Sequence, residues 1–197
     1  MNKNSKVVLV LALAFLSLNA NAQYSIQAGY LKSDNIAKAA IGGTSVTTNN
    51  SGFYVGLNAA WPIARIENLY YEGGILYSYL GDKNGDVTEN IHLLNFPLHL
   101  KYQYDVTPQI GIFGFAGPTA SIGLAAHDKD SSTSVSLYGD NGILNRVDLK
   151  LGIGGGLEFS KKLAVRIGYD WGLFNMSKIE NVKMNLNYFH VGIAYNL

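Results

Sequence analysis

Apolar side chains alternate with small or polar ones in one segment after another along this chain. In residues 163–171 every odd position is apolar or aromatic, and every even position is small or charged. Residues 147–159 and 189–197 repeat this pattern. Successive side chains of a strand point to opposite faces, so the period of two predicts strands that each have one apolar face.

Earlier segments with the same alternation bring the number of predicted strands to eight. They are residues 24–32, 53–61, 69–80, 92–104 and 109–124. Gly117 and Pro118 predict a bulge in the last of these. Pro97 predicts a second irregularity, because proline cannot donate a hydrogen bond to a neighbouring strand.

The predicted connections alternate between long and short. The long ones are residues 33–52, 81–90, 125–146 and 174–185, and the short ones are 62–68, 105–108 and 160–162. Transmembrane barrels have short turns in the periplasm and long loops outside. We therefore expect the long connections to be extracellular loops and both ends of the barrel domain to be periplasmic.

The composition favours a barrel in a membrane. Hydrophobic residues make up 48% of the chain and charged residues 15%, against about 25% charged in soluble domains. No segment after residue 22 is apolar for long enough to be a spanning helix. The other structure that satisfies every backbone group in lipid is a closed barrel.

A soluble lipocalin-like barrel is the alternative, because it shows the same alternation with the apolar face turned inward. In this chain the second face is rich in glycine, alanine and serine rather than lysine and glutamate, which suits a narrow lumen. Aromatic residues also lie near predicted strand ends, as in interfacial girdles. They are Trp61, Tyr102, Tyr104, Tyr169 and Trp171. The sequence thus predicts an all-β fold, an eight-stranded antiparallel up-and-down transmembrane β-barrel.

The N-terminus has the features of a secretory signal peptide. Lys3 and Lys6 precede an apolar run, residues 7–18, and Ala20 and Ala22 provide small residues for cleavage. The run is shorter than the roughly 20 apolar residues that span a bilayer. We expect residues 1–22 to be removed and residues 23–197 to form one barrel domain in the bacterial outer membrane.

The composition also excludes several classes of function. The chain has no cysteine, which rules out disulfides and thiolate chemistry. Its net charge is +1 and no basic cluster stands out, so nucleic acid is not an expected partner.

Charged and histidine side chains on the predicted inward face are the candidate site. They are Glu72, His99, Lys101, Asp148, Lys150, Glu158, Arg166, Asp170 and His190. They could form a proton or ion pathway, or an ion-pair network that plugs the lumen. Buried charges must be paired, and an eight-stranded lumen is narrow, so we favour the plug. We expect Glu72 to pair with Lys101 and Glu158 with Arg166, all in the periplasmic half.

No metal, cofactor or catalytic site is expected. The histidines have no close-spaced partner ligand, which argues against zinc. Residues 82–86 resemble a calcium loop, but the glycine and glutamate that such a loop needs are missing from their places. His127, Asp128 and Ser131 lie together in a predicted outer loop. They leave open the alternative of a small enzyme that acts on lipid A at the outer rim.

Several segments resemble the PorT-like family of outer-membrane β-barrels. These are residues 70–78, 91–102, 115–118, 152–157 and 169–173, which span most of the predicted barrel. The chain ends in leucine, whereas the family tends to end in phenylalanine. The resemblance implies an outer-membrane barrel, in a family named after a member tied to protein secretion.

These observations predict a non-enzymatic protein with a structural, interaction or secretion-accessory role and a narrow, plugged lumen. We expect it to be a monomer surrounded by outer-membrane lipid. Contacts with protein partners would be made by the extracellular loops or by the periplasmic turns; the sequence assigns no particular role to residues 33–52 and 125–146.

Overall fold

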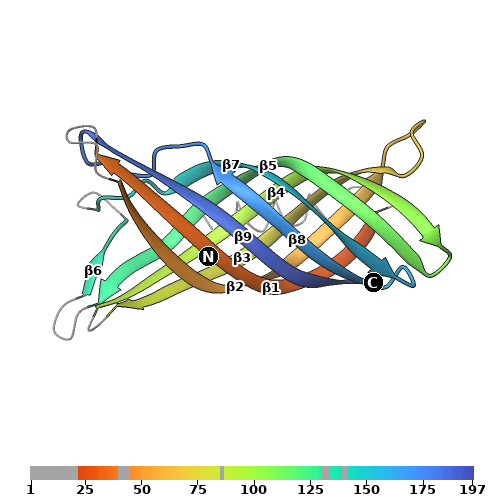
Figure 1. The fold of residues 1–197 in the computed structure, drawn as a ribbon, viewed down its shortest axis with the longest axis horizontal. Coiled ribbons are helices and arrows are strands. Elements are labelled where there is room, and N and C mark those ends of the chain that lie inside the picture. The colour runs from red at the N-terminus through yellow and green to blue at the C-terminus, as the bar shows by residue number, and fades with distance from the viewer. Residues whose placement is uncertain (1–21, 40–44, 85–86, 130–133, 139–141) are drawn as a thin grey trace, which may run out of the picture.

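The structure is a closed barrel of tilted, antiparallel strands (Figure 1). It is a computed structural model that describes residues 22–39, 45–84, 87–129, 134–138 and 142–197. Among these residues no helix is long and apolar enough to cross a membrane. The predicted signal peptide lies almost wholly outside the described residues and stays a prediction.

Eight long strands form the wall, as the alternation predicted, and each pairs with its neighbours in an antiparallel manner. They are β1 (Gln23–Ala39), β2 (Ser45–Pro62), β3 (Leu69–Asn84), β4 (Val87–Thr107), β5 (Ile110–Lys129), β7 (Val147–Phe159), β8 (Leu163–Gly172) and β9 (Val182–Asn196). Pairing of β1 with β9 and of β4 with β5 closes the sheet. A short ninth strand, β6 (Ser134–Ser136), pairs with the outer end of β5.

The outward face is an apolar belt between two aromatic girdles. In mid-barrel, Ile153, Ile167 and Ile193 are about half exposed on the isolated chain, as lipid-facing side chains are. Exposed Tyr102 and Tyr104 lie at the end where the turns are short, which marks that end as periplasmic. At the other end the rings of Tyr169 and Trp171 are 5.1 Å apart. The outward parity predicted for these strands is therefore confirmed.

The strands continue well beyond the predicted boundaries at the outer end. Much of the predicted loops 33–52, 81–90 and 125–146 is strand, so those loop assignments are wrong in extent. The physical reason is that the amphipathic pattern inverts there. On β1 the outward residues become Lys32 and Asp34, whose side chains form an ion pair at 3.6 Å, while Leu31 is buried inside.

The backbone irregularities match the predicted ones only in part. The irregularity predicted at Pro97 is present, since the ladder of β4 with β3 skips Phe96 and Pro97. The bulge expected at Gly117 and Pro118 is wrong. The ladder with β4 skips these two residues but has the same register on either side of them, and their pairing with β7 is continuous. The register shifts of β5 with β4 lie instead next to His92 and Thr107. Gly117 is still required, since its φ is 158° and an added Cβ would collide with the Leu98 carbonyl.

Candidate functional site

All the predicted inward charges and histidines lie inside the barrel. Glu72, His99, Lys101, Asp148, Lys150, Glu158, Arg166 and Asp170 are each at most 8% exposed, and His190 is half-buried beside them. Glycines on the same inward face make room for the larger side chains. A Cβ at Gly154 would overlap the ring of Phe115, and one at Gly168 would overlap that of His190. The lumen is therefore filled by side chains.

A two-pronged ion pair crosses the periplasmic half of the lumen. Arg166 on β8 donates from Nη1 to Oε2 of Glu72 on β3 at 2.9 Å, and from Nη2 to Oε1 at 2.5 Å. Asn58 Nδ2 also donates to Glu72 Oε1, at 3.3 Å. The guanidinium carbon lies 4.5 Å from the ring centre of Phe115. This fork-to-fork geometry is the strongest kind of side-chain pairing.

The ion pairs expected from sequence are not the ones that form. Lys101 has no carboxylate within 4 Å among the described residues, and its Nζ lies 4.6 Å from the ring centre of Phe113. Glu158 accepts hydrogen bonds from two amides instead, Gln103 Nε2 at 2.7 Å and Asn196 Nδ2 at 3.1 Å. The expected pairs Glu72–Lys101 and Glu158–Arg166 were wrong.

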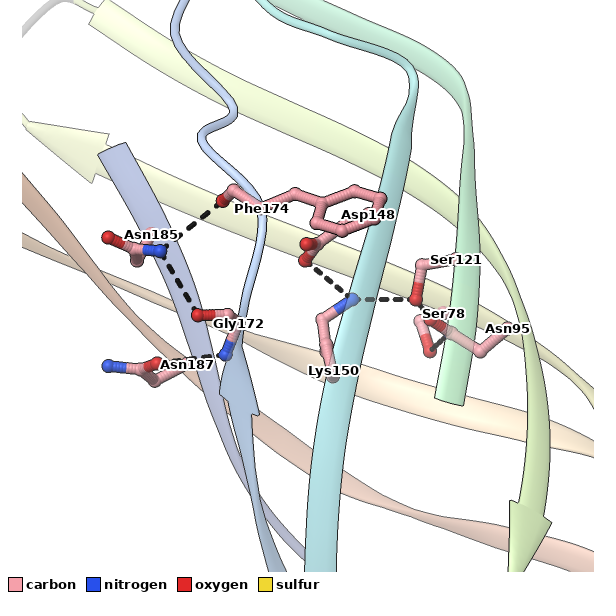
Figure 2. A network of polar contacts seen from close by, with 9 residues as sticks. All are labelled: Ser78, Asn95, Ser121, Asp148, Lys150, Gly172, Phe174, Asn185 and Asn187. Atoms are coloured by element: carbon pink, nitrogen blue, oxygen red, sulfur yellow. Dashed lines mark hydrogen bonds and ion pairs between the residues drawn. The ribbon is translucent and has the colours of Figure 1, made fainter. Parts of the chain in front are cut away.

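A second polar layer lies nearer the outside and joins four strands (Figure 2). Lys150 Nζ is 3.1 Å from Asp148 Oδ2 and donates to Ser121 Oγ at 2.6 Å. Ser121 Oγ donates to Asn95 Oδ1 at 2.6 Å, and Asn95 Nδ2 donates to Ser78 Oγ at 2.8 Å. This chain of contacts joins four consecutive strands, β7, β5, β4 and β3, along one side of the inner wall.

Between the two layers lies a small cavity of about 60 Å³. Its lining includes polar atoms that have no hydrogen-bond partner, Gln27 Nε2, Asn58 Oδ1, His99 Nδ1 and Tyr188 Oη. Asp170 and His190 also line it, with Oδ2 and Nε2 3.4 Å apart. A polar cavity of this size has room for a few waters, which would satisfy these atoms.

An apolar core closes the outer end of the lumen, and sequence reasoning missed it. Side chains from the outer connections, Leu137, Leu144 and Met176, are each at most 7% exposed and pack on inward residues such as Leu80 and Leu93. Backbone hydrogen bonds hold these connections in place; for example, Met176 N donates to Met184 O at 2.8 Å. The inverted alternation at the strand ends, with leucine on the inward face, is the signal that could have revealed this core.

The sequence candidates for catalysis are left untested. Ser131 lies outside the described residues, and for His127 and Asp128 only the backbone, as part of β5, is described. Within the described part of the chain, no three metal-ligating side chains cluster.

Comparison with known proteins supports the architecture. The model of the outer membrane protein beta-barrel domain family matches residues 15–178. No curated protein matches the chain significantly. The solved structure of the outer membrane enzyme PagL is 15% identical, with a TM-score of 0.53, covering 85% of this chain and 99% of that one. Neisserial surface protein A is 14% identical, with a TM-score of 0.50, covering 89% and 99%.

At identities of 14% and 15%, the likeness to these two solved structures shows that the fold is shared and says nothing about activity. The family match covers most of the chain, and the closed barrel with its apolar belt agrees with it. The chain therefore belongs to the outer membrane protein beta-barrel domain family and is an eight-stranded barrel of the bacterial outer membrane.

Proposed function

We propose that this protein is a non-enzymatic, non-conducting barrel that works as an interaction scaffold, with a structural or secretion-accessory role. The observation that carries this proposal is the lumen, which is blocked at three levels. The Glu72–Arg166 layer, the Lys150 layer and the outer apolar core lie one above the other between the two ends. A barrel without a pore can function only through the surfaces at its two ends and on its lipid-facing wall, by binding other molecules there.

The outer end is the stronger candidate for contacts with other proteins. There, β1 and β2 remain paired from Lys38 and Ser45 inward, and β5 continues to Lys129 with β6 beside it. Paired strands present a rigid surface, which lowers the entropy cost of binding a partner. The resemblance of residues 70–78 and 91–102 to PorT-like barrels is the reason to consider a secretion-accessory role for this surface.

Site-specific photo-crosslinking in intact cells tests the proposal. The reactive group would replace Thr47 at the outer end, Glu67 in a periplasmic turn, or Ile193 in mid-barrel, all of which are exposed. We expect a discrete protein adduct from Thr47 or Glu67 and only lipid adducts from Ile193. Adducts confined to lipid at all three positions would contradict an interaction scaffold.

The lipid A of a deletion strain tests the enzymatic alternative. A non-enzymatic scaffold predicts that the acyl chains of lipid A, measured by mass spectrometry, are unchanged when the gene is deleted. A loss or gain of one acyl chain that is reversed by the restored gene would favour a rim enzyme and overturn the proposal.

A further inference from the structure

An open groove of about 470 Å³ lies on the outer rim beside β7 and the end of β8. It is lined by Asn145, Arg146, Val147, Leu173, Phe174 and Asn175. β7 runs for 13 residues, whereas a tilted strand needs about 9–11 to cross the hydrocarbon. Val147, at the outer end of this strand, therefore lies at or just beyond the outer edge of the apolar belt, and Arg146 lies one residue further out.

The side chain of Arg146 is held in place by hydrogen bonds, but its positive charge is not paired with a carboxylate of the described residues. Its Nη1 donates to the carbonyls of Gly123 and Leu124 at 3.3 and 3.4 Å, and its guanidinium carbon lies 5.4 Å from the ring centre of Tyr138. No carboxylate of the described residues is within 4 Å of it, and its Nε and Nη2 form no hydrogen bond with them. A held guanidinium with free donors is suited to a phosphate.

The walls of the groove are fixed by hydrogen bonds within the rim. Asn145 Nδ2 donates to Asn175 O at 3.0 Å. Asn185 Nδ2 donates to Gly172 O at 3.0 Å and to Phe174 O at 3.3 Å (Figure 2). These bonds use side-chain amides to hold the backbone, so the groove is formed before any ligand arrives. A preformed site loses less entropy on binding.

The other half of the lining is apolar and open. Val147, Leu173 and Phe174 are 48–55% exposed, and Val147 continues the outward row of β7 that faces lipid. A lipid can therefore reach the groove by lateral diffusion, with its acyl chain against these side chains and its headgroup beside Arg146. The six lining residues include no serine, histidine or carboxylate, so the groove has the chemistry for binding and none for hydrolysis.

We propose that this groove binds a phosphate-bearing glycolipid of the outer leaflet, with Arg146 on the phosphate and Leu173 and Phe174 against the start of an acyl chain. The site would hold the barrel at a defined depth and retain an annular lipid at one point of its circumference. It does not depend on the interaction scaffold proposed above.

Native mass spectrometry of the full barrel in detergent tests this site. The probes are lipid A with two phosphates, the same lipid A after phosphatase treatment, and phosphatidylglycerol. We expect the phosphorylated lipid A to bind about tenfold more tightly than the dephosphorylated form, the factor that one charge-assisted hydrogen bond supplies. Phosphatidylglycerol, which has a single phosphate, should bind no more tightly than the phosphorylated lipid A. Arg146→Gln should remove this preference, and Phe174→Ala should weaken binding of both forms of lipid A.

Arg65→Gln is the matched control, because Arg65 is an exposed arginine in a periplasmic turn, and it should bind like the wild type. The heat-dependent mobility of each barrel on a gel checks folding. If Arg146→Gln does not fold, the comparison of the two lipid A forms still decides. Equal binding of the two forms of lipid A, tighter binding of phosphatidylglycerol than of phosphorylated lipid A, or a preference that survives Arg146→Gln would overturn the proposal.

Discussion

The charged residues of the lumen differ in the kind of group that stabilises them: an opposite charge, side-chain amides or an aromatic ring. Removing a charge from water costs several kcal/mol unless a partner restores the lost hydrogen bonds. Glu72 forms a bidentate ion pair with Arg166. Glu158 on β7 accepts hydrogen bonds from amides of the next strands but one, Gln103 on β4 and Asn196 on β9. Lys101 lies over an aromatic ring. The lumen thus uses three different ways to accommodate buried charge.

A double-mutant cycle on Glu72→Gln and Arg166→Met tests the central ion pair. Each single substitution leaves a buried charge without its partner and should cost about 3–5 kcal/mol, while the double variant should cost much less than the sum. Urea unfolding in lipid vesicles measures the free energies.

Lys101→Met provides the matched control for this cycle. Lys101 is as buried as Arg166 but forms no ion pair with Glu72 within 4 Å. Its coupling energy with Glu72→Gln should therefore be clearly smaller. A larger coupling for Lys101 than for Arg166 would show that the pairing described above is incorrect.

The sequence predicted which residues enter the lumen but not which of them meet. The period of two assigns each side chain to a face, and all the predicted inward charges are inside. Because Glu72 and Lys101 lie on neighbouring strands, the sequence suggested an ion pair between them. The actual partner, Arg166, is 94 residues away on the opposite wall, and strand alternation carries no information on contacts across a barrel.

The strands that extend beyond the membrane, such as β3 and β4, combine two amphipathic patterns, and this explains the errors in the predicted strand ends. Within the membrane the apolar residues point out, as Ile167 does. Beyond it they point in, as Leu80 and Leu93 do, and form the outer core. A prediction that follows only the apolar-out pattern ends the strand at the residue where the apolar-in pattern begins. The boundary between the patterns is where the strand leaves the lipid.

Arginine substitutions on β8 test the depth of the belt. Ile167→Arg puts a charge on the lipid face in mid-strand and should cost about 2–4 kcal/mol of unfolding free energy, whereas Leu163→Arg at the periplasmic end of the same strand should cost about 0–1 kcal/mol. Both residues are outward and exposed. Equal costs, measured by urea unfolding in vesicles, would mean that β8 does not cross the membrane as described.

Truncation of Met176 tests the outer core. Met176 is 1% exposed in the connection between β8 and β9, and Met176→Ala should cost about 2–5 kcal/mol in local packing. We expect protease added outside vesicles to cut this connection faster than in the wild type. Ile179→Ala, at a 50% exposed position of the same connection, is the control and should leave the rate unchanged.

The whole molecule is a closed wall around a closed interior. The wall suits a lipid environment, since each long strand is hydrogen-bonded to a neighbour on both sides and the sheet has no open edge. The interior is polar in two layers and apolar at the outer end, and the cavity between the polar layers is only about 60 Å³. Such an interior is what the proposed non-conducting scaffold requires, and it would leave the rim and the ends of the barrel as the functional surfaces.

Single-channel recording in planar bilayers measures this closure directly. The purified, refolded barrel should insert without stable current steps of the size that porins give, and Arg146→Gln, which changes the rim alone, should behave identically. Reproducible large conductance steps from the wild-type barrel would contradict the filled lumen and, with it, the proposed non-conducting scaffold.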